Sequence, residues 1–204
     1  GVKSGDTVIV LGCGPVGLLT QKFAWFKGAK RVIAVDHLDY RLEHAKRTNK
    51  VETVNFAQYE NTGEYLKEIT KGGADIVIDC SGMSGKMTPM EYLASGLKLH
   101  GGAMGGIVIA SQAVRKAGTI QITGVYGGRY NGFPLGDIFQ RNVDIKTGQA
   151  PVIPYMPYLY KLISEGKVDP GDVVTHVLPI DQAKHGYEVF DTRTDGCIKV
   201  VLKP

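Results

Sequence analysis

Short apolar runs alternate with helical segments of about a dozen residues along most of the chain. Thr7–Leu11 (TVIVL) is a continuous, β-branched apolar run, which is typical of a strand buried on both faces of a parallel sheet. Pro15–Lys27 predicts a helix, because proline suits a first turn and Gly28 supplies a C-terminal stop. The other predicted strands are Arg31–Val35, Thr53–Phe56, Ala74–Asp79, Thr119–Thr123 and Val143–Thr147, and the other predicted helices are Asp39–Arg47, Gly63–Thr70, Pro89–Lys98 and Ile107–Lys116.

This alternation predicts the architecture of the larger part of the chain. Strands joined by helical segments form right-handed crossovers, so we expect an α/β fold with a doubly wound, parallel six-stranded sheet and helices on both faces. Residues 1–147 would form this sheet, and 148–204 an appended C-terminal segment. That segment begins with a proline cluster (APVIPYMPY) and predicts a helix over Tyr158–Glu165, an extended stretch over Val173–Leu178, a helix over Asp181–Phe190 and a strand over Ile198–Leu202.

A glycine-spaced turn separates the first predicted strand from the first helix. Gly12-x-Gly14-x-x-Gly17 has the spacing in which one glycine permits a tight turn, the next admits a pyrophosphate, and the last lets helix and strand pack. Asp36 ends the second predicted strand, where a carboxylate can accept both ribose hydroxyls of an adenosine. Together they predict a Rossmann-like dinucleotide-binding domain. The alternative is a structural glycine turn, with Asp36 capping the next helix.

Asp36 also predicts which dinucleotide binds. Hydrogen bonds to a charged group contribute roughly 1.5–3 kcal/mol, and a 2′-phosphate would replace them with repulsion between anions. We therefore expect NAD to be preferred over NADP by at least about tenfold. His37 and Arg41 could soften this preference by turning toward the phosphate, although we expect Arg41 to lie against the adenosine.

Charge and cysteine usage narrow the class of protein. The net charge of +4 comes from 24 basic and 20 acidic side chains, and aromatic residues are not interleaved with the basic stretches, so we expect no nucleic-acid partner. No apolar run approaches the ~20 residues of a membrane helix and no secretory signal is recognisable, so we expect no membrane partner and a cytoplasmic protein, or an excised piece of one. Cys13, Cys80 and Cys197 fit neither a disulfide framework nor a zinc ribbon, and we expect Cys13 to be a small packing residue.

Several stretches resemble the medium-chain, zinc-dependent alcohol dehydrogenases. GVKSGDTVIVLGCGPVGLL is similar to the start of their coenzyme domain, and AVD followed by DYRLEHAKR is similar to its second strand and helix. GGADIVIDCSG, GTIQITGVYGG and VVTHVLPIDQAKHGYEVFDTRTDGCIKVVLKP continue in the order of the family. The last stretch, with TGQAPV, is most similar to the branch of formaldehyde-dehydrogenase-like and threonine-dehydrogenase-like enzymes.

The resemblance implies which residues contact an NAD cofactor. Around the pyrophosphate and the adenosine ribose, it implies Gly12, Gly14, Pro15, Val16 and Gly17, then Asp36 and Arg41. Farther along the chain, it implies Cys80 and Ser81 on the adenosine side, Thr123, Gly124 and Val125 beside the nicotinamide, Gly148, Gln149 and Ala150 near the carboxamide, and Lys199 reaching the pyrophosphate.

The resemblance also implies hydride transfer between an alcohol or aldehyde and nicotinamide, with zinc in the intact parent. The family binds that zinc through segments that precede the coenzyme domain, and a catalytic zinc needs three protein ligands. The histidines here are scattered without cysteine partners, so we expect no metal site and no catalytic residue, and a fragment that is inactive by itself. His176 is expected to be structural. The five histidines are His37, His44, His100, His176 and His185.

Two other functions stay open. One is a zinc-free, quinone-reductase-like enzyme that uses NADPH, against which Asp36 argues, and the other is a non-enzymatic nucleotide-sensing domain, because a fold does not fix a function. Since the family often pairs through sheet edges, we expect a homo-oligomer. Self-association is also favoured by an apolar patch that we expect to be exposed, at Val152, Ile153, Tyr155 and Met156.

Two stretches depart from the family pattern. RTNK, residues 47–50, stands where the family usually has a Leu-Gly-Ala turn, so we expect Asn49 to take the left-handed conformation, which it tolerates better than most residues. HGGAMGG, residues 100–106, is interpreted as a linker between helices, with a loop at the ligand as the alternative.

Overall fold

The computed structural model describes residues 1–81, 105–126 and 132–204. One parallel sheet contains six strands, in the order β3-β2-β1-β4-β5-β6. The order runs outward in both directions from the β1–β4 pair, so the sheet is Rossmann-like and doubly wound, as predicted. The strands are β1 (Thr7–Leu11), β2 (Arg31–Asp36), β3 (Glu52–Asn55), β4 (Ala74–Asp79), β5 (Val114–Ile122) and β6 (Asp144–Thr147).

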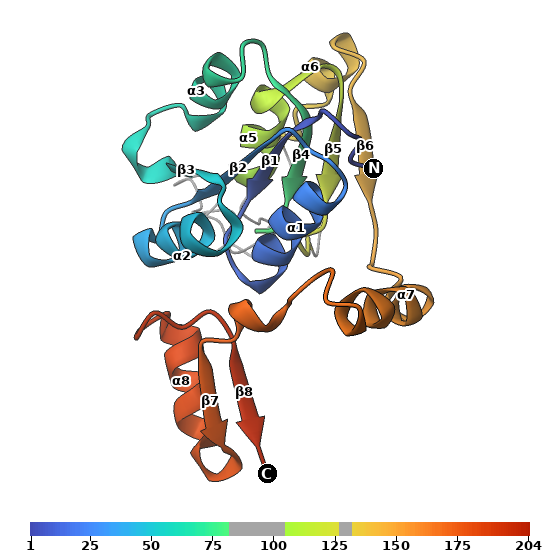
Figure 1. Cartoon of the computed structure of the whole chain (residues 1–204). Helices are drawn as coiled ribbons and strands as arrows, with labels where there is room; N and C mark the ends of the chain where they lie inside the picture. The colour runs from blue at the N-terminus through green and yellow to red at the C-terminus, as the bar shows by residue number, and fades with distance from the viewer. Residues whose placement is uncertain (82–104, 127–131) are drawn as a thin grey trace.

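Helices cover both faces of this sheet (Figure 1). Alternate residues of β1 point to opposite faces: Val8 and Val10 pack toward α1 and α2, whereas Ile9 and Leu11 pack toward α3, α5 and α6. Burial on both faces explains why this strand reads as a continuous apolar run. The helices are α1 (Pro15–Phe26), α2 (Asp39–Asn49), α3 (Thr62–Ile69), α5 (Gly105–Ala113) and α6 (Leu135–Gln140), of which α6 was not predicted.

The junction between α5 and β5 differs from the prediction. The predicted helix ran over Ile107–Lys116, but α5 ends before Val114, which pairs with Ala74 of β4. The next residue, Arg115, donates from Nε to Asp75 Oδ1 at 2.8 Å. Because pairing with β4 starts at residue 114, the strand begins earlier than the sequence pattern indicates. The predicted helix over Pro89–Lys98 lies outside the described residues.

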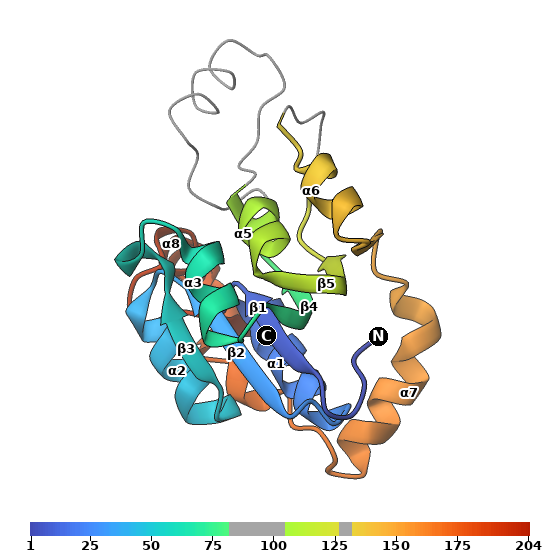
Figure 2. The same ribbon diagram turned by 90° about the horizontal axis from the view of Figure 1, so that it is seen from above.

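The rest of the chain forms a long helix and a small sheet. β7 and β8 pair in parallel as a separate two-stranded sheet. Figure 1 shows α8 beside β7 and β8. All three lie beyond the carboxyl ends of β1 and β4, which the arrowheads of those strands mark. Figure 2 shows α7 along one side of the molecule. The elements are α7 (Val152–Ser164), η3 (Gly171–Val173), β7 (His176–Pro179), η4 (Ile180–Gln182), α8 (Ala183–Thr192) and β8 (Val200–Lys203).

α7 is longer than predicted because its prolines do not stop it. The helix begins at Val152, not at Tyr158. Pro154 lies in the first turn, where its missing N–H needs no intrahelical partner. Pro157 lies inside the helix. None of the described helices is both long and apolar enough to cross a membrane.

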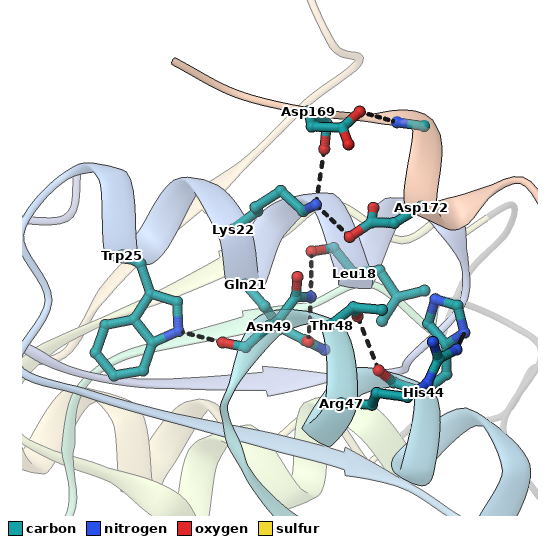
Figure 3. A network of polar contacts seen from close by, with 11 residues as sticks. Leu18, Gln21, Lys22, Trp25, His44, Arg47, Thr48, Asn49, Asp169 and Asp172 are labelled. Atoms are coloured by element: carbon teal, nitrogen blue, oxygen red, sulfur yellow. Dashed lines mark hydrogen bonds and ion pairs between the residues drawn. The ribbon is translucent and has the colours of Figure 1, made fainter. Parts of the chain in front are cut away.

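Asn49 is helical, and the prediction that it takes the left-handed conformation was wrong. Its Nδ2 donates to the Leu18 carbonyl and to Gln21 Oε1, both at 2.9 Å, and its own carbonyl accepts from Trp25 Nε1 at 2.9 Å (Figure 3). These bonds hold the buried Asn49 in α2, against α1. The left-handed position therefore falls to Lys50, with φ of 54°.

A polar contact and shared apolar burial attach the C-terminal segment to α1. Lys22 Nζ donates to Asp172 Oδ2 at 2.5 Å and to the Asp169 carbonyl at 2.7 Å (Figure 3). Val173 and Ile198 are buried in the same apolar cluster as the inner faces of α1 and α2. These contacts fix the C-terminal segment to the side of the sheet that α1 and α2 cover.

Candidate functional site

A cleft of about 530 Å³ opens at the carboxyl ends of β1, β2 and β4. Ligands of open α/β sheets bind at this kind of place, where the strand order reverses. It brings together most of the residues predicted near the glycine turn and Asp36. The lining residues are the predicted Gly12, Gly14, Pro15, Asp36, Arg41, Cys80 and Ser81, with Leu11, Val35, His37, Phe56, Gly105, Gly106, Ile109, Phe190, Asp191 and Arg193.

Internal packing explains two of the three glycines of the turn. Gly12 has φ of +96°, and a Cβ there would lie 3.4 Å from the backbone of Cys80 and Ser81. A Cβ on Gly17 would lie 1.9 Å from the Gly12 carbonyl oxygen, which leaves no room for any side chain where α1 meets β1. These are the steric roles predicted for the first and third glycines of the spacing.

Gly14 differs from them because no described part of the chain requires a glycine there. Its φ of −74° suits any residue, and a Cβ would meet only Arg41 Nη1, at 3.7 Å, among the described residues. The missing side chain instead leaves the cleft open above the backbone of residue 14. A group bound in the cleft can therefore approach this backbone closely.

The N-terminus of α1 forms the wall of the cleft beside Gly14. Gly14 is the N-cap, no side chain caps the helix, and the first turn carries no acidic residue. The unpaired N–H groups of this turn and the positive end of the helix dipole favour an anion. The donor set and the open space both fit a phosphate group.

Asp36 lies at the end of β2 and is only 6% exposed. Its Oδ2 accepts from the Cys13 N–H at 2.7 Å, and its Oδ1 accepts from the N–H groups of His37 at 2.7 Å and Leu38 at 3.1 Å. Asp36 therefore fastens the glycine turn and also supports the start of α2, as the structural alternative required. A carboxylate has about four acceptor positions, so acceptor capacity is left for a ligand in the cleft that Asp36 lines.

Arginines from two distant parts of the chain line the same cleft. Arg41 of α2 lies over the glycine turn, and its Nε donates to the Tyr40 hydroxyl at 3.1 Å. Arg193, directly after α8, lines the cleft together with Phe190 and Asp191. Sequence reasoning missed these three residues, because only tertiary packing brings α8 to the glycine turn.

The start of α5 supplies another unpredicted part of the cleft. Gly105 and Gly106 line it, although they belong to the stretch that was interpreted as a linker. The linker prediction was wrong for these two residues. The alternative, a loop at the ligand, does not describe them either, because both residues are helical.

Two cysteines lie next to the glycine turn, and both are poor nucleophiles. Burial raises the pKa of the Cys13 thiol far above its ordinary value, and the nearby Asp36 carboxylate raises it further. Burial likewise raises the pKa of Cys80 to about 12. Cys13 is fully buried in the apolar cluster, which supports the prediction that it is a packing residue.

The remaining sequence-predicted residues lie outside this cleft. Val16 is 53% exposed and lines a separate apolar hollow beside α1. Lys199 lines a smaller hollow of about 190 Å³ between α8 and β8. The segments that follow β5 and β6 stay predictions as cofactor contacts: Thr123, Gly124 and Val125, then Gly148, Gln149 and Ala150.

Within residues 1–81, 105–126 and 132–204, no three His, Cys, Asp or Glu side chains gather as a group that could hold a metal ion. His176 has a hydrogen-bond partner at each ring nitrogen: Thr175 Oγ1 lies 2.9 Å from Nδ1, and Asp195 Oδ2 lies 3.1 Å from Nε2. The described residues do not fit the zinc ion that the resemblance implies for the parent, and we assign no chemical step to zinc in this chain.

Comparison with known proteins shows what the chain is similar to. A family described as zinc-binding dehydrogenase matches residues 15–104. The uncharacterized zinc-type alcohol dehydrogenase-like protein AdhB of Bacillus subtilis is 76% identical over all 204 residues, which cover 54% of its own length. The chain is similar to zinc-type alcohol dehydrogenase-like proteins over nearly all of its residues. It spans about half the length of the curated relatives that it matches.

Solved dehydrogenase structures share its fold. Zinc-dependent alcohol dehydrogenase 2 from Streptococcus pneumonia has a TM-score of 0.81 and 26% identity, over 99% of this chain and 52% of that one. At 22% and 23% identity, where the likeness is one of fold alone, an Escherichia coli CFT073 alcohol dehydrogenase (TM-score 0.76) is complexed with NADH, and a Sinorhizobium meliloti zinc-binding dehydrogenase (TM-score 0.75) is bound to NADP. Each similarity covers the whole of this chain and little more than half of the other, 53% and 54%.

Proposed function

We propose that residues 1–147 are the NAD-binding domain of an alcohol dehydrogenase-like oxidoreductase. The observation that carries this proposal is Gly14, whose missing side chain serves the cleft and not the packing of the chain. The uncapped start of α1 and the buried Asp36 line the same cleft. Similarity to zinc-type alcohol dehydrogenase-like proteins supports the same conclusion.

In this proposal the chain binds and orients the cofactor. The backbone at Gly14 and the first turn of α1 hold the diphosphate, Asp36 accepts from the adenosine ribose hydroxyls, and Arg41 lies beside them. The nicotinamide, when bound, supplies the carbon that accepts or releases hydride. Residues 148–204 pack on the catalytic part of the parent, where an alcohol or aldehyde would react and zinc would be held. The cofactor contacts outside the cleft in this proposal are Val16, Thr123, Gly124, Val125, Gly148, Gln149, Ala150 and Lys199.

Asp36 makes NAD the preferred dinucleotide. We expect NADH to bind at least about tenfold more tightly than NADPH in titrations followed by cofactor fluorescence, because a 2′-phosphate would meet the carboxylate. Asp36→Asn removes the negative charge, so the difference in affinity between NADH and NADPH should become smaller. Asp39→Asn is the matched control, since Asp39 is exposed and bonds instead to Asn55 Nδ2 at 2.7 Å. Equal or tighter binding of NADPH by the native chain would contradict the proposal and favour a quinone-reductase-like enzyme.

The chain by itself should turn over no simple alcohol. The proposed role gives it cofactor binding and no acid–base residue, so added zinc should make no difference. The measurement is NADH formation by the pure chain with ethanol or 2-propanol, with and without zinc. Turnover in a metal-replete sample would show that the reacting groups lie within these 204 residues.

A further inference from the structure

Asp79 is a fully buried carboxylate at the end of β4 that the proposed function does not use. Its Oδ2 accepts from the Tyr126 hydroxyl at 2.5 Å, and its Oδ1 accepts from the Ser81 hydroxyl at 2.6 Å and the Ser81 N–H at 2.9 Å. Its backbone carbonyl accepts from the N–H groups of Thr123 and Gly124, both at 2.9 Å. A single residue thus binds the segments that leave β4 and β5.

The start of α5 is fitted against the same group. A Cβ on Gly106 would lie 2.9 Å from Ser81 Oγ and 3.0 Å from Asp79 Oδ1, so this helix reaches the carboxylate only because residue 106 has no side chain. Ser81 and Gly106 both line the cleft. A buried carboxylate is costly unless its oxygens are hydrogen-bonded. Here the donors come from Ser81, which lines the cleft, and from Tyr126 in the turn after β5.

The strand order indicates which part of a dinucleotide would lie against the segments that follow β4 and β5. Asp36 ends β2, on one side of β1, whereas Asp79 ends β4, on the other side. With the diphosphate at Gly14 and the adenosine at Asp36, the second nucleoside has to extend over the ends of β4 and β5. That is where Asp79 holds Ser81, Gly106 and the turn after β5. Ser81 is thereby assigned to the nicotinamide side and not to the adenosine side that the resemblance implies.

We propose that Asp79 is a positioning residue that fixes the nicotinamide side of the cleft through Ser81, Gly106 and the Thr123–Tyr126 turn. The proposal rests on the proposed function, since it assumes that the cleft holds a dinucleotide. Asp79 contacts no cofactor in this arrangement. It acts by keeping two wall positions, Ser81 and Gly106, and the neighbouring turn after β5 in one geometry. Its loss should therefore weaken binding of the nicotinamide half of the ligand and not of the adenosine half.

The test compares NADH with ADP, which lacks the nicotinamide nucleoside. Asp79→Asn and Tyr126→Phe should each weaken NADH binding at least about fivefold and reduce the change in NADH fluorescence on binding, while ADP affinity stays within about twofold of native. Asp75→Asn is the matched control. Asp75 begins the same strand and accepts from the Thr7 N–H at 2.7 Å and Arg115 Nε at 2.8 Å, away from the cleft, so NADH binding should be unchanged.

The outcomes separate the two proposals. A native chain that binds neither ADP nor NADH would refute the proposed function, and this inference with it. If the native chain binds both, then equal losses of ADP and NADH in the variants would show that Asp79 is only structural, and unchanged NADH binding in Tyr126→Phe would also overturn the inference. Tyr126→Phe removes a single hydroxyl, so it keeps the test decisive should Asp79→Asn fail to fold.

Discussion

Gly14 is left without a side chain for a ligand, whereas Gly12 and Gly17 are glycines because the fold requires them. Gly14→Ala places one methyl group in the open cleft without a forbidden φ, so stability should fall by no more than about 1 kcal/mol, the cost of a poorer N-cap. NADH affinity should fall at least about tenfold, because the methyl group occupies the space proposed for the diphosphate. Thermal unfolding and fluorescence titration measure the two effects.

Gly17→Ala is the contrasting variant. Its Cβ would lie 1.9 Å from the Gly12 carbonyl oxygen, so the loss should appear as unfolding and not as selective loss of binding. If Gly14→Ala binds NADH as tightly as the native chain does, the diphosphate does not lie over residue 14.

Individual residues were predictable where their role is local. The three glycines and Asp36 follow from the strand-turn-helix pattern, and the structure gathers Gly12, Gly14 and Asp36 around one cleft. Arg193 was not predictable, because only the packing of the C-terminal segment brings it to that cleft. The hydrogen bonds of Asp79 were hidden for the same reason, since Tyr126 lies 47 positions farther along the chain.

Among the elements, the contact between α1 and η3 is open to a direct stability test. Lys22→Met removes the donor that Asp172 Oδ2 and the Asp169 carbonyl share, and the ion pair is partly buried, with side chains 19% and 26% exposed. We expect the free energy of unfolding to fall by about 1–2 kcal/mol, because Asp172 then loses its cationic partner.

Urea denaturation measures that change, and Lys184→Met is the matched control. Lys184 Nζ lies 3.9 Å from Glu188 Oε1, and the Lys184 side chain is 90% exposed. Lys184→Met should therefore leave the free energy of unfolding unchanged within measurement error. A Lys22→Met chain as stable as the native one would mean that this contact does not hold the C-terminal segment.

Helices and strands were predicted accurately where a single hydrophobic pattern extends over the whole element. β1 and β4 have the predicted ends because their apolar runs are buried on both faces of the sheet. The start of β5 and the end of α2 were predicted at the wrong residues because contacts with partners distant in sequence determine them. Val114 pairs with Ala74 of β4, and hydrogen bonds to α1 hold Asn49 within α2. The sequence places the start of α7 too late, at Tyr158, because a proline cluster is typical of a break in a helix.

At the scale of the whole molecule, an apolar surface on α7 favours self-association. Val152, Ile153, Tyr155 and Met156 are 59%, 80%, 56% and 57% exposed, which confirms that the predicted patch is exposed. We expect the chain to self-associate, and Ile153→Ser with Met156→Ser to reduce this association, as measured by light scattering across a concentration series.

A similar exposed residue on the small sheet provides the control. Val177 of β7 is 52% exposed, and Val177→Ser should leave the association unchanged if α7 is the contact surface. If the native chain stays monomeric at high concentration, α7 is not a self-association surface.

The most direct measurement is a crystal structure of the chain grown with NAD. The diphosphate is predicted to lie on the backbone at Gly14 and the start of α1, with an adenosine ribose hydroxyl within hydrogen-bond distance of Asp36. An empty cleft in crystals grown at millimolar NAD, or a dinucleotide bound elsewhere on the chain, would contradict this assignment.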